Sequence, residues 1–361
     1  MLTLEARAAP SAALSILAPV VAVGLTLVAG YLLFELLGVD GGRALFVFFV
    51  RPVQDLYGLG ELAVKAAPLI LIGVGLALGF RANVWNIGAE GQFALGAVAG
   101  GAVALAAHGA EGWWTLPAMI VAGALGGAAW AALPALFRTR FNTNEILTSL
   151  MLTYVGVLFL SYLVHGPLKS PDSFNFPESR PFGEQALLPV IVEGTRVHLG
   201  VLLAPLAVLG GWFVLARLHL GYQIRVIGLA PRAGAYAGFS QRRVVWATLL
   251  GSGALAGLAG VAEVAGPIGQ LQPAISPGYG FTAIIVAFLG RLHPVGVFFA
   301  GTLIALSYLG GEFVQIELGL PLAVTGVFQG MLLFFVLGCE VLVRYRVRIG
   351  GARNAVRGRA A

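Results

Sequence analysis

The chain has 361 residues, of which 58% are hydrophobic and only 11% are charged. A soluble domain carries roughly a quarter charged residues, so this composition excludes a water-exposed globular surface and favours a chain embedded in membrane lipid. The net charge of +6 does not indicate a nucleic-acid partner, because the Lys and Arg residues lie between apolar runs and form no patch with interleaved aromatic residues.

A helix needs about 20 apolar residues to cross a bilayer. We therefore predict an all-α fold, a polytopic transmembrane helical bundle of about ten spans that forms one domain over residues 1–361. The run at 278–290 is too short to cross a bilayer alone without distortion, and the two runs that flank 81–92 are also short. We therefore expect broken or short helices near 81–92 and 267–290. The ten apolar runs lie near 14–38, 62–80, 89–108, 113–137, 144–165, 199–217, 244–266, 278–290, 294–311 and 319–343.

The Lys and Arg residues predict the orientation. With ten spans and both termini cytoplasmic, 16 of the 22 fall on the cytoplasmic side, as the positive-inside rule requires. Two long polar connections then face opposite sides: an external loop at 166–198 and a basic cytoplasmic loop at 218–243. A basic cytoplasmic tail follows at 344–361. The 16 are Arg7, Arg81, Arg138, Arg140, Arg217, Arg225, Arg232, Arg242, Arg243, Arg291, Arg344, Arg346, Arg348, Arg353, Arg357 and Arg359.

Glycine spacing predicts close helix packing, because glycines four residues apart let two membrane helices approach closely. The chain has 51 glycines, so some of these spacings are expected by chance. The pairs are Gly96/Gly100, Gly123/Gly127, Gly253/Gly257 and Gly326/Gly330.

Several kinds of site are not expected in this chain. A Walker-type phosphate loop needs a lysine after a glycine, but Lys65 follows Val64 and Lys169 follows Leu168. We therefore expect no ATPase site and no cofactor here, with ATP-Mg bound by a partner subunit. A single cysteine and five scattered histidines give no metal-ligand spacing, and no nucleophile–base spacing indicates a catalytic residue.

The segment FRANVWNIGAEGQ at 80–92 places polar residues between two short apolar runs. Interrupted backbone at membrane depth is tolerated where it is buried in protein or lines a water-filled path. Gly88 and Gly91 permit such a break. Two interpretations stay open: a broken helix beside a translocation path, or an ordinary loop in which Glu90 interacts favourably with a helix dipole.

The basic stretch GYQIRVIGLAPRAGAYAGFSQRR at 221–243 contains a second candidate element. Pro231 suits the first turn of a helix, and the following small residues predict a short helix that ends at Gly238. Such an exposed helix can dock into a groove on a partner protein. The alternative is a charged turn that only enforces topology, but the length of the stretch favours docking.

Four strings carry a family resemblance: NIGAEGQ at 86–92, NTNEILTSLMLTY at 142–154, RVIGLAPRAGAYAG at 225–238, and SGALAGLAG at 252–260 followed by Glu263. Together they resemble ABC importer permeases of the branched-chain amino acid and simple-sugar permease superfamily, over roughly residues 60–340. The first two strings are most similar to the nucleoside-type branch, whose receptors are basic-membrane-protein lipoproteins.

The resemblance implies an assembly and a set of site residues. Two permeases, either like chains or this chain with a paralogue, form the pathway; two ABC ATPases dock on it, and an extracytoplasmic lipoprotein delivers the solute. Residues 229–239 would be the coupling helix, with Ala230 and Gly234 departing from the family's usual Asn and Ala. The residues assigned to ATPase coupling are Arg225, Gly228, Pro231, Arg232, Ala237 and Gly238. The translocation-path candidates are Asn83, Asn86, Glu90, Gln92, Asn144, Glu145 and Glu263.

The predicted function is therefore that of a transporter subunit in the cytoplasmic (inner) membrane that moves nucleosides or related small polar solutes inward. Simple sugars such as ribose, and branched-chain amino acids, stay open as alternatives because the receptor sets specificity in such systems. An ion-coupled secondary transporter is the alternative of a different class, and Glu263 would then be its coupling acid.

Overall fold

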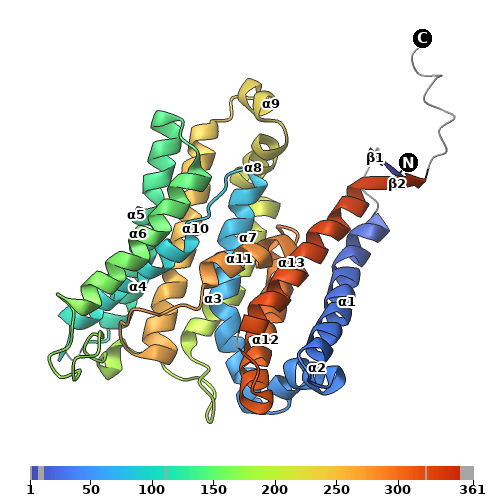
Figure 1. Cartoon of the computed structure of the whole chain (residues 1–361). Helices are drawn as coiled ribbons and strands as arrows, with labels where there is room; N and C mark the ends of the chain where they lie inside the picture. Colours follow the sequence, from blue (N-terminus) through green and yellow to red (C-terminus); the bar gives the residue numbers. More distant parts are fainter. Residues whose placement is uncertain (1, 7–11, 110–111, 322, 350–361) are drawn as a thin grey trace. The chain divides into compact units, whose positions relative to one another are not determined.

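The computed structural model describes residues 2–6, 12–109, 112–321 and 323–349 (Figure 1). Helices dominate these residues, as predicted, with one short antiparallel ribbon between strands β1 (Leu2–Ala6) and β2 (Tyr345–Ile349). The helices are α1 (Ala12–Leu36), α2 (Gly41–Phe49), α3 (Leu56–Arg81), α4 (Ala89–Ala106), α5 (Thr115–Phe141), α6 (Glu145–His165), α7 (Leu203–Arg217), α8 (His219–Leu229), α9 (Pro231–Tyr236), α10 (Gln241–Glu263), α11 (Tyr279–Leu289), α12 (Pro294–Leu318) and α13 (Ala323–Arg344). Short 3₁₀ turns lie at Arg51–Val53, Glu184–Ala186 and Leu199–Leu202.

Every one of the ten predicted apolar runs forms a helix. Among the residues that the structure describes, seven helices are long and apolar enough to cross a membrane: α3, α4, α5, α6, α7 with its preceding 3₁₀ turn, α10 with its π-helical extension, and α12. Three further apolar helices are shorter, at Val20–Leu36, Tyr279–Leu289 and Ala323–Cys339. The polytopic helical bundle is thus confirmed. Helices α2 and α8 lie in stretches for which the sequence predicted no helix.

The contacts divide the chain into two compact units, residues 1–51 with 310–361 and residues 52–309. The first unit packs phenylalanines from α1, α2 and α13: the rings of Phe48 and Phe328 stack with centroids 4.6 Å apart, and Phe34 lies 5.5 Å from Phe328. Arg51 pairs with Glu317 at 3.0 Å within this unit. Most of the predicted basic tail, residues 350–361, lies outside the described residues, and the single domain predicted for the whole chain stays a prediction.

The second unit, residues 52–309, contains every predicted site residue and is built around the crossing of α4, α5 and α10. Glycines make this crossing possible: a Cβ atom at Gly257 would lie 2.1 Å from the carbonyl oxygen of Gly123, and one at Gly96 would lie 2.2 Å from the Cα of Gly257. Three of the four predicted glycine pairs meet here, whereas Gly326 and Gly330 in α13 have open space beside them.

Both predicted helix breaks are present in residues 52–309. Helix α3 ends at Arg81, and the chain runs through irregular backbone with Asn83 at φ 55° before α4 begins at Ala89. Helix α10 continues into a π-helical turn, Val264–Ile268, that Gly269 ends in the left-handed conformation. Extended backbone then leads to the short helix α11. A π-turn inside an apolar helix is often found at a functional site.

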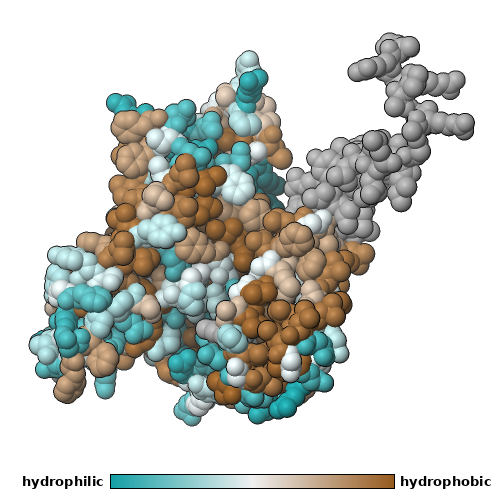
Figure 2. All heavy atoms as spheres, viewed as in Figure 1, coloured by the Kyte–Doolittle hydropathy of each residue, from teal (hydrophilic) through white to brown (hydrophobic). Residues whose placement is uncertain are grey.

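The connections of this unit gather at two ends (Figure 1). Helices α8 and α9 lie at one end, which we call the α9 end, and the loop at 166–198 lies at the opposite end. Figure 2 shows apolar residues along the flanks of the helices and hydrophilic residues near α9 and on the loops. Exposed Leu125, Leu158 and Leu209 belong to these flanks. An apolar flank between two polar ends is the surface that a bilayer requires.

Candidate functional site

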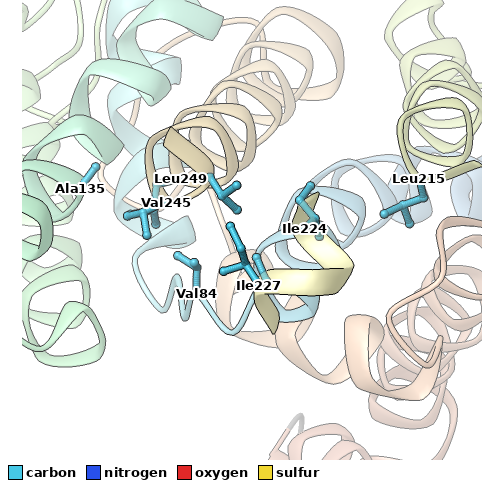
Figure 3. Packing of buried hydrophobic residues seen from close by; sticks show 9 residues of the cluster. Val84, Ala135, Leu215, Ile224, Ile227, Val245 and Leu249 are labelled. Carbon is cyan, nitrogen blue, oxygen red and sulfur yellow. The ribbon is translucent and has the colours of Figure 1, made fainter. Parts of the chain in front are cut away.

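A buried apolar cluster fixes α8 to the rest of the α9 end. Ile224 and Ile227 of α8 pack against Val84, Leu215 and Leu249, which belong to the broken segment, α7 and α10 (Figure 3). All five side chains are almost fully buried. Burying large aliphatic side chains stabilises such an arrangement by about 1.5–3 kcal/mol each in water, and dense packing keeps it rigid. The cluster therefore joins α8 to three neighbouring elements as one body.

Two predicted coupling residues reinforce this attachment. The guanidinium of Arg225 donates from Nη2 to the carbonyl oxygen of Leu215 at 2.8 Å and from Nε to that of Gly221 at 3.3 Å, which ties α8 to the end of α7. At Gly228 a Cβ atom would lie 1.9 Å from the carbonyl oxygen of Arg81. Helix α8 thus touches the last turn of α3 backbone to backbone, which only glycine allows.

The short helix predicted at Pro231 is present as α9. Pro231 occupies its first turn, and Gly238, at φ +79°, ends it in the left-handed conformation while Phe239 N donates to Gly234 O at 2.9 Å. Ala230 at the N-cap has no side chain that can cap the helix, as its departure from the family pattern led us to expect. The second departure has a packing reason, because a Cβ at Gly234 would lie 3.2 Å from Cγ1 of Ile227.

The exposed face of this region differs from the one the sequence singled out. Arg232 and Ala237 are exposed, as a partner contact would require, but so are Leu229 and Tyr236, at 88% and 95%. Sequence reasoning missed these two residues. Large side chains in a loop that otherwise consists of small and basic residues are the signal that would have found them.

Among the path candidates, Asn86 and Gln92 face each other in the interior. Asn86 Nδ2 donates to Gln92 Oε1 at 2.8 Å and to Ser252 Oγ at 3.0 Å, and Gln92 Nε2 donates back to Asn86 Oδ1 at 3.0 Å. Asn86 Oδ1 also accepts from Gly88 N at 3.0 Å. All three side chains are buried. The network joins the broken segment to α4 and α10, and each amide is occupied by a protein partner.

Glu90, on the first turn of α4, holds the start of α11. Its Oε2 accepts the backbone N–H of Gly280 at 2.6 Å, and the hydroxyl of Ser276 is a second hydrogen-bond partner of its side chain. A Cβ at Gly280 would lie 2.2 Å from Glu90 N, so the two helix N-termini are in direct contact. A carboxylate is favourable there because both helix dipoles present their positive ends. The two breaks of the unit therefore meet at this carboxylate.

The glycines of the first break have a different role from the one expected. Gly88 and Gly91 were expected to permit the break through their conformational freedom, but neither has a positive φ. Instead, a Cβ at Gly88 would lie 2.9 Å from Ser149 O, and one at Gly91 would lie 2.8 Å from the Cα of Thr153. These two positions require glycine because the backbone of α6 passes directly against them.

Asn83, Asn144 and Glu145 lie nearer the α9 end. Asn144 caps α6 by accepting Ile146 N at 2.9 Å, and Asn83 accepts Trp85 Nε1 at 2.9 Å. The buried carboxylate of Glu145 forms an ion pair with Arg138 and accepts Trp85 N at 3.4 Å. These contacts hold the broken segment against α5 and α6.

Glu263 lies at the opposite end, among charged residues that the sequence analysis did not group. It interacts electrostatically with Lys65, Arg196 and Glu61. Arg196, from the 166–198 loop, binds the Glu61 carboxylate through Nε at 2.7 Å and Nη2 at 2.5 Å, and this bond raises the pKa of Arg196. The ring of nearby His198 is buried, and burial followed by the charge of Arg196 lowers its pKa to about 4.

The structure thus separates the seven path candidates into three places. Asn86, Glu90 and Gln92 lie together where the two breaks meet; Asn83, Asn144 and Glu145 lie toward the α9 end; and Glu263 lies at the opposite end. Contact between these residues and a solute remains a prediction.

Comparisons with known proteins identify the class. Residues 58–337 match the family described as the permease component of the branched-chain amino acid transport system. The glucose ABC transporter permease protein of Haloferax volcanii is 38% identical, with 98% of this chain and 95% of that protein covered. The guanosine ABC transporter permease protein of Bacillus subtilis is 31% identical, with 89% and 92% covered. The nucleoside ABC transporter permease protein of Lactococcus lactis is 25% identical, with 80% and 81% covered.

The chain is therefore a multi-pass membrane protein of the permease class. It belongs to the permease family of the branched-chain amino acid transport system, and its predicted identity as an ABC-type permease subunit is confirmed.

Proposed function

We propose that this chain is the permease subunit of an importer that moves nucleosides or related small polar solutes inward, driven by a separate ABC ATPase. Relatives named as guanosine and nucleoside permeases, aligned over most of both chains, support this substrate class. The observation that carries the mechanism is the backbone contact of α8 with the last turn of α3 at Gly228.

This contact gives a physical route from the ATPase to the pathway. An ATPase that grips the exposed face of α9, with Arg232 and Tyr236, moves α8 as well, because Gly234 of α9 packs against Ile227 of α8 and the apolar cluster joins α8 to its neighbours. Helix α8 then acts on α3 next to the break at 82–88, which leads directly to Asn86 and Glu90. The ATPase shifts the permease between two states only through contacts that differ between those states.

We also propose that the α9 end faces the cytoplasm, with both termini cytoplasmic and the chain in the inner membrane; the charge distribution of residues 52–309 supports the first of these. In residues 52–309 the arginines concentrate toward this end, as the positive-inside rule predicts for a cytoplasmic face. Toward the α9 end lie Arg81, Arg138, Arg140, Arg217, Arg225, Arg232, Arg242, Arg243 and Arg291; toward the opposite end lie Lys65, Lys169, Arg180 and Arg196.

The partners follow from this assignment. ATP-Mg binds to the ATPase, which docks at the α9 end, and a solute-binding lipoprotein delivers its cargo at the opposite end. A second permease, either the same chain or a paralogue, completes the pathway. We propose no cofactor for this chain itself.

A simple sugar is the second candidate for the cargo. The relative from Haloferax volcanii that is 38% identical is named as a glucose permease, and it aligns with nearly the whole chain. Nucleosides and simple sugars both carry sugar hydroxyl groups, so the same polar pathway suits both. The receptor then selects between them.

Uptake into proteoliposomes that contain the permeases, the ATPase and the binding protein tests this proposal. We expect ATP-dependent accumulation of radiolabelled guanosine, with glucose and leucine as competing cargoes. The matched variants are Arg232→Glu, on the exposed face of α9, and Arg180→Glu, on the loop at the opposite end. The first should abolish ATP stimulation without loss of protein, and the second should leave it intact. Uptake that needs no nucleotide and collapses with an uncoupler would show instead an ion-coupled carrier.

A further inference from the structure

A hairpin in the 166–198 loop and its continuation, residues 188–200, bridges two helices at the end opposite α9. We call this hairpin the strap. Its two arms are joined by Ile191 N to Val197 O at 2.8 Å and by Leu199 N to Pro189 O at 2.9 Å, and it turns at Gly194, which has φ +75°.

One face of the strap sits on the N-terminal part of α3. Arg196 forms the bidentate ion pair with Glu61, whose side chain is only 8% exposed, whereas the Arg196 side chain is 51% exposed. Beside this pair a Cβ at Gly60 would lie 2.9 Å from the Cβ of Thr195. The contact with α3 thus consists of one ion pair open to water and a small close-packed patch.

The other face of the strap is bound to the π-helical end of α10. Leu188 N donates to Ala265 O at 2.8 Å, and the buried ring of His198 lies directly over Gly266, where a Cβ would be 2.5 Å from Nε2. His198 Nδ1 has no hydrogen-bond partner among the residues that the structure describes. The preceding part of the loop continues this attachment, with Phe182 N to Gly269 O at 2.8 Å and Ser179 N to Leu271 O at 2.9 Å.

The two attachments differ in how easily they break. The bonds to the π-turn and the following extended segment are backbone hydrogen bonds, which are costly to leave unmade when buried. The ion pair to α3 is a single side-chain contact whose Arg196 partner is half exposed, so water replaces it more easily than it replaces the buried backbone bonds to α10. A strap that moves would therefore stay with α10 and its extension and separate from α3.

Charges from both helices converge below the strap. Glu263 of α10 interacts with Lys65 and Glu61 of α3 as well as with Arg196 of the strap, so two cations and two carboxylates balance while the strap is seated. When Arg196 leaves, the two carboxylates share one lysine, so the charge balance at this end depends on the position of the strap.

We propose that the strap is a gate: seated on α3 it closes the end of the permease opposite α9, and its release from Glu61 opens that end to solute. The direction of solute movement through this gate rests on the proposed function, but the gate itself does not.

A reversible cross-link tests the gate in the reconstituted complex. Gly60→Cys with Thr195→Cys, in a Cys339→Ser background, places two thiols across the moving contact, and the 2.9 Å between the two Cβ positions must widen by about 1 Å to reach the separation of about 3.8 Å found in disulfides. Oxidation should reduce ATP-driven uptake by at least about 10-fold, and a reductant should restore it. Thr195→Cys alone, oxidised in the same way, is the control and should transport normally.

If the cross-link forms poorly, solute leak through two single variants provides an independent test of the gate. Glu61→Gln and Arg196→Gln should each raise downhill solute leak without nucleotide by several-fold, while Glu178→Gln, on the part of the loop that stays with α10, should not. Full uptake by the cross-linked pair, or unchanged leak in both single variants, would overturn the gate. Wild-type uptake without ATP would instead overturn the proposed function, and the leak measurement would still test the gate.

Discussion

The two ends of the unit formed by residues 52–309 are held together in different ways. At the α9 end, α8 is fixed by buried aliphatic side chains and by backbone contact at Gly228. At the opposite end, the strap is seated on α3 by the Arg196–Glu61 ion pair, one partner of which is half exposed.

This difference matches the work that each end would do. Close-packed apolar contacts transmit displacement because they cannot stretch or slide, so the α9 end suits a lever. A polar contact reached by water can be exchanged for solvent at little cost, so the strap suits a part that opens and closes. Four predictions test this contrast, beginning with the largest expected effect.

Gly228→Val should detach α8 from α3. The added carbon atoms would overlap the carbonyl oxygen of Arg81, and relief requires the backbone of α8 to move, at a cost of about 3 kcal/mol. We expect a lower unfolding temperature in detergent and loss of ATP-driven uptake. Gly251→Ala, on α10 where open space surrounds the glycine, is the matched control and should leave both unchanged. Normal uptake by Gly228→Val would mean that the α9 end is not a rigid lever.

The attachment of the strap to the end of α10 should weaken as the pH falls. The pKa of His198 in the folded protein is about 4, below the ordinary 6.5, so its neutral form is favoured when buried. The contribution of neutral His198 to the free energy of unfolding is complete above pH 6.5. It is lost as the pH falls from 6.5 toward 4, by at most about 3 kcal/mol. The charged group that acts on it is Arg196.

The measurement for His198 is the unfolding temperature at pH 7.5, 6 and 5, taken as the difference between the wild type and His198→Gln. Other titrating groups cancel in this difference. We expect the wild type to lose its advantage over the variant as the pH falls. A difference that does not change with pH would show that protonation of His198 plays no part in holding the strap on α10.

Arg225→Gln should have an intermediate effect at the α9 end. The variant loses the bonds from the guanidinium to Leu215 O and Gly221 O, which are worth about 1–3 kcal/mol for a charged donor. We expect a modest fall in unfolding temperature and a several-fold loss of coupled uptake. Arg232→Gln, which changes an exposed arginine on α9, should alter coupling alone. Equal destabilisation by both variants would contradict the structural role of Arg225.

The smallest effect is expected from the ion pair itself. A double-mutant cycle of Glu61→Gln and Arg196→Gln should give a coupling energy below about 1 kcal/mol that decreases with added salt, because water reaches the Arg196 side chain. Unfolding curves at low and high salt provide the measurement. A large coupling insensitive to salt would make the strap as firmly seated as α8, and the contrast between the ends would disappear.

Much of the fold followed from local sequence features. The lengths of the apolar runs located the helices, and the polar residues around Asn86 and the short run at 278–290 located both breaks. Pro231 and Gly238 located the start and end of α9, because each restricts or permits backbone angles at its own position. Helix α2 was missed because its nine residues are too few for a span.

The roles of the site residues depended on the tertiary structure. Asn86 meets Ser252 across 166 positions, and Arg196 meets Glu61 across 135. Sequence spacing gives no information on such pairs, because their distance is set by how the helices cross. The amino-acid sequence by itself determined where the backbone is helical and where it is interrupted. Only the packing of distant segments decided that Arg225 binds the end of α7 and that the strap lies between α3 and α10.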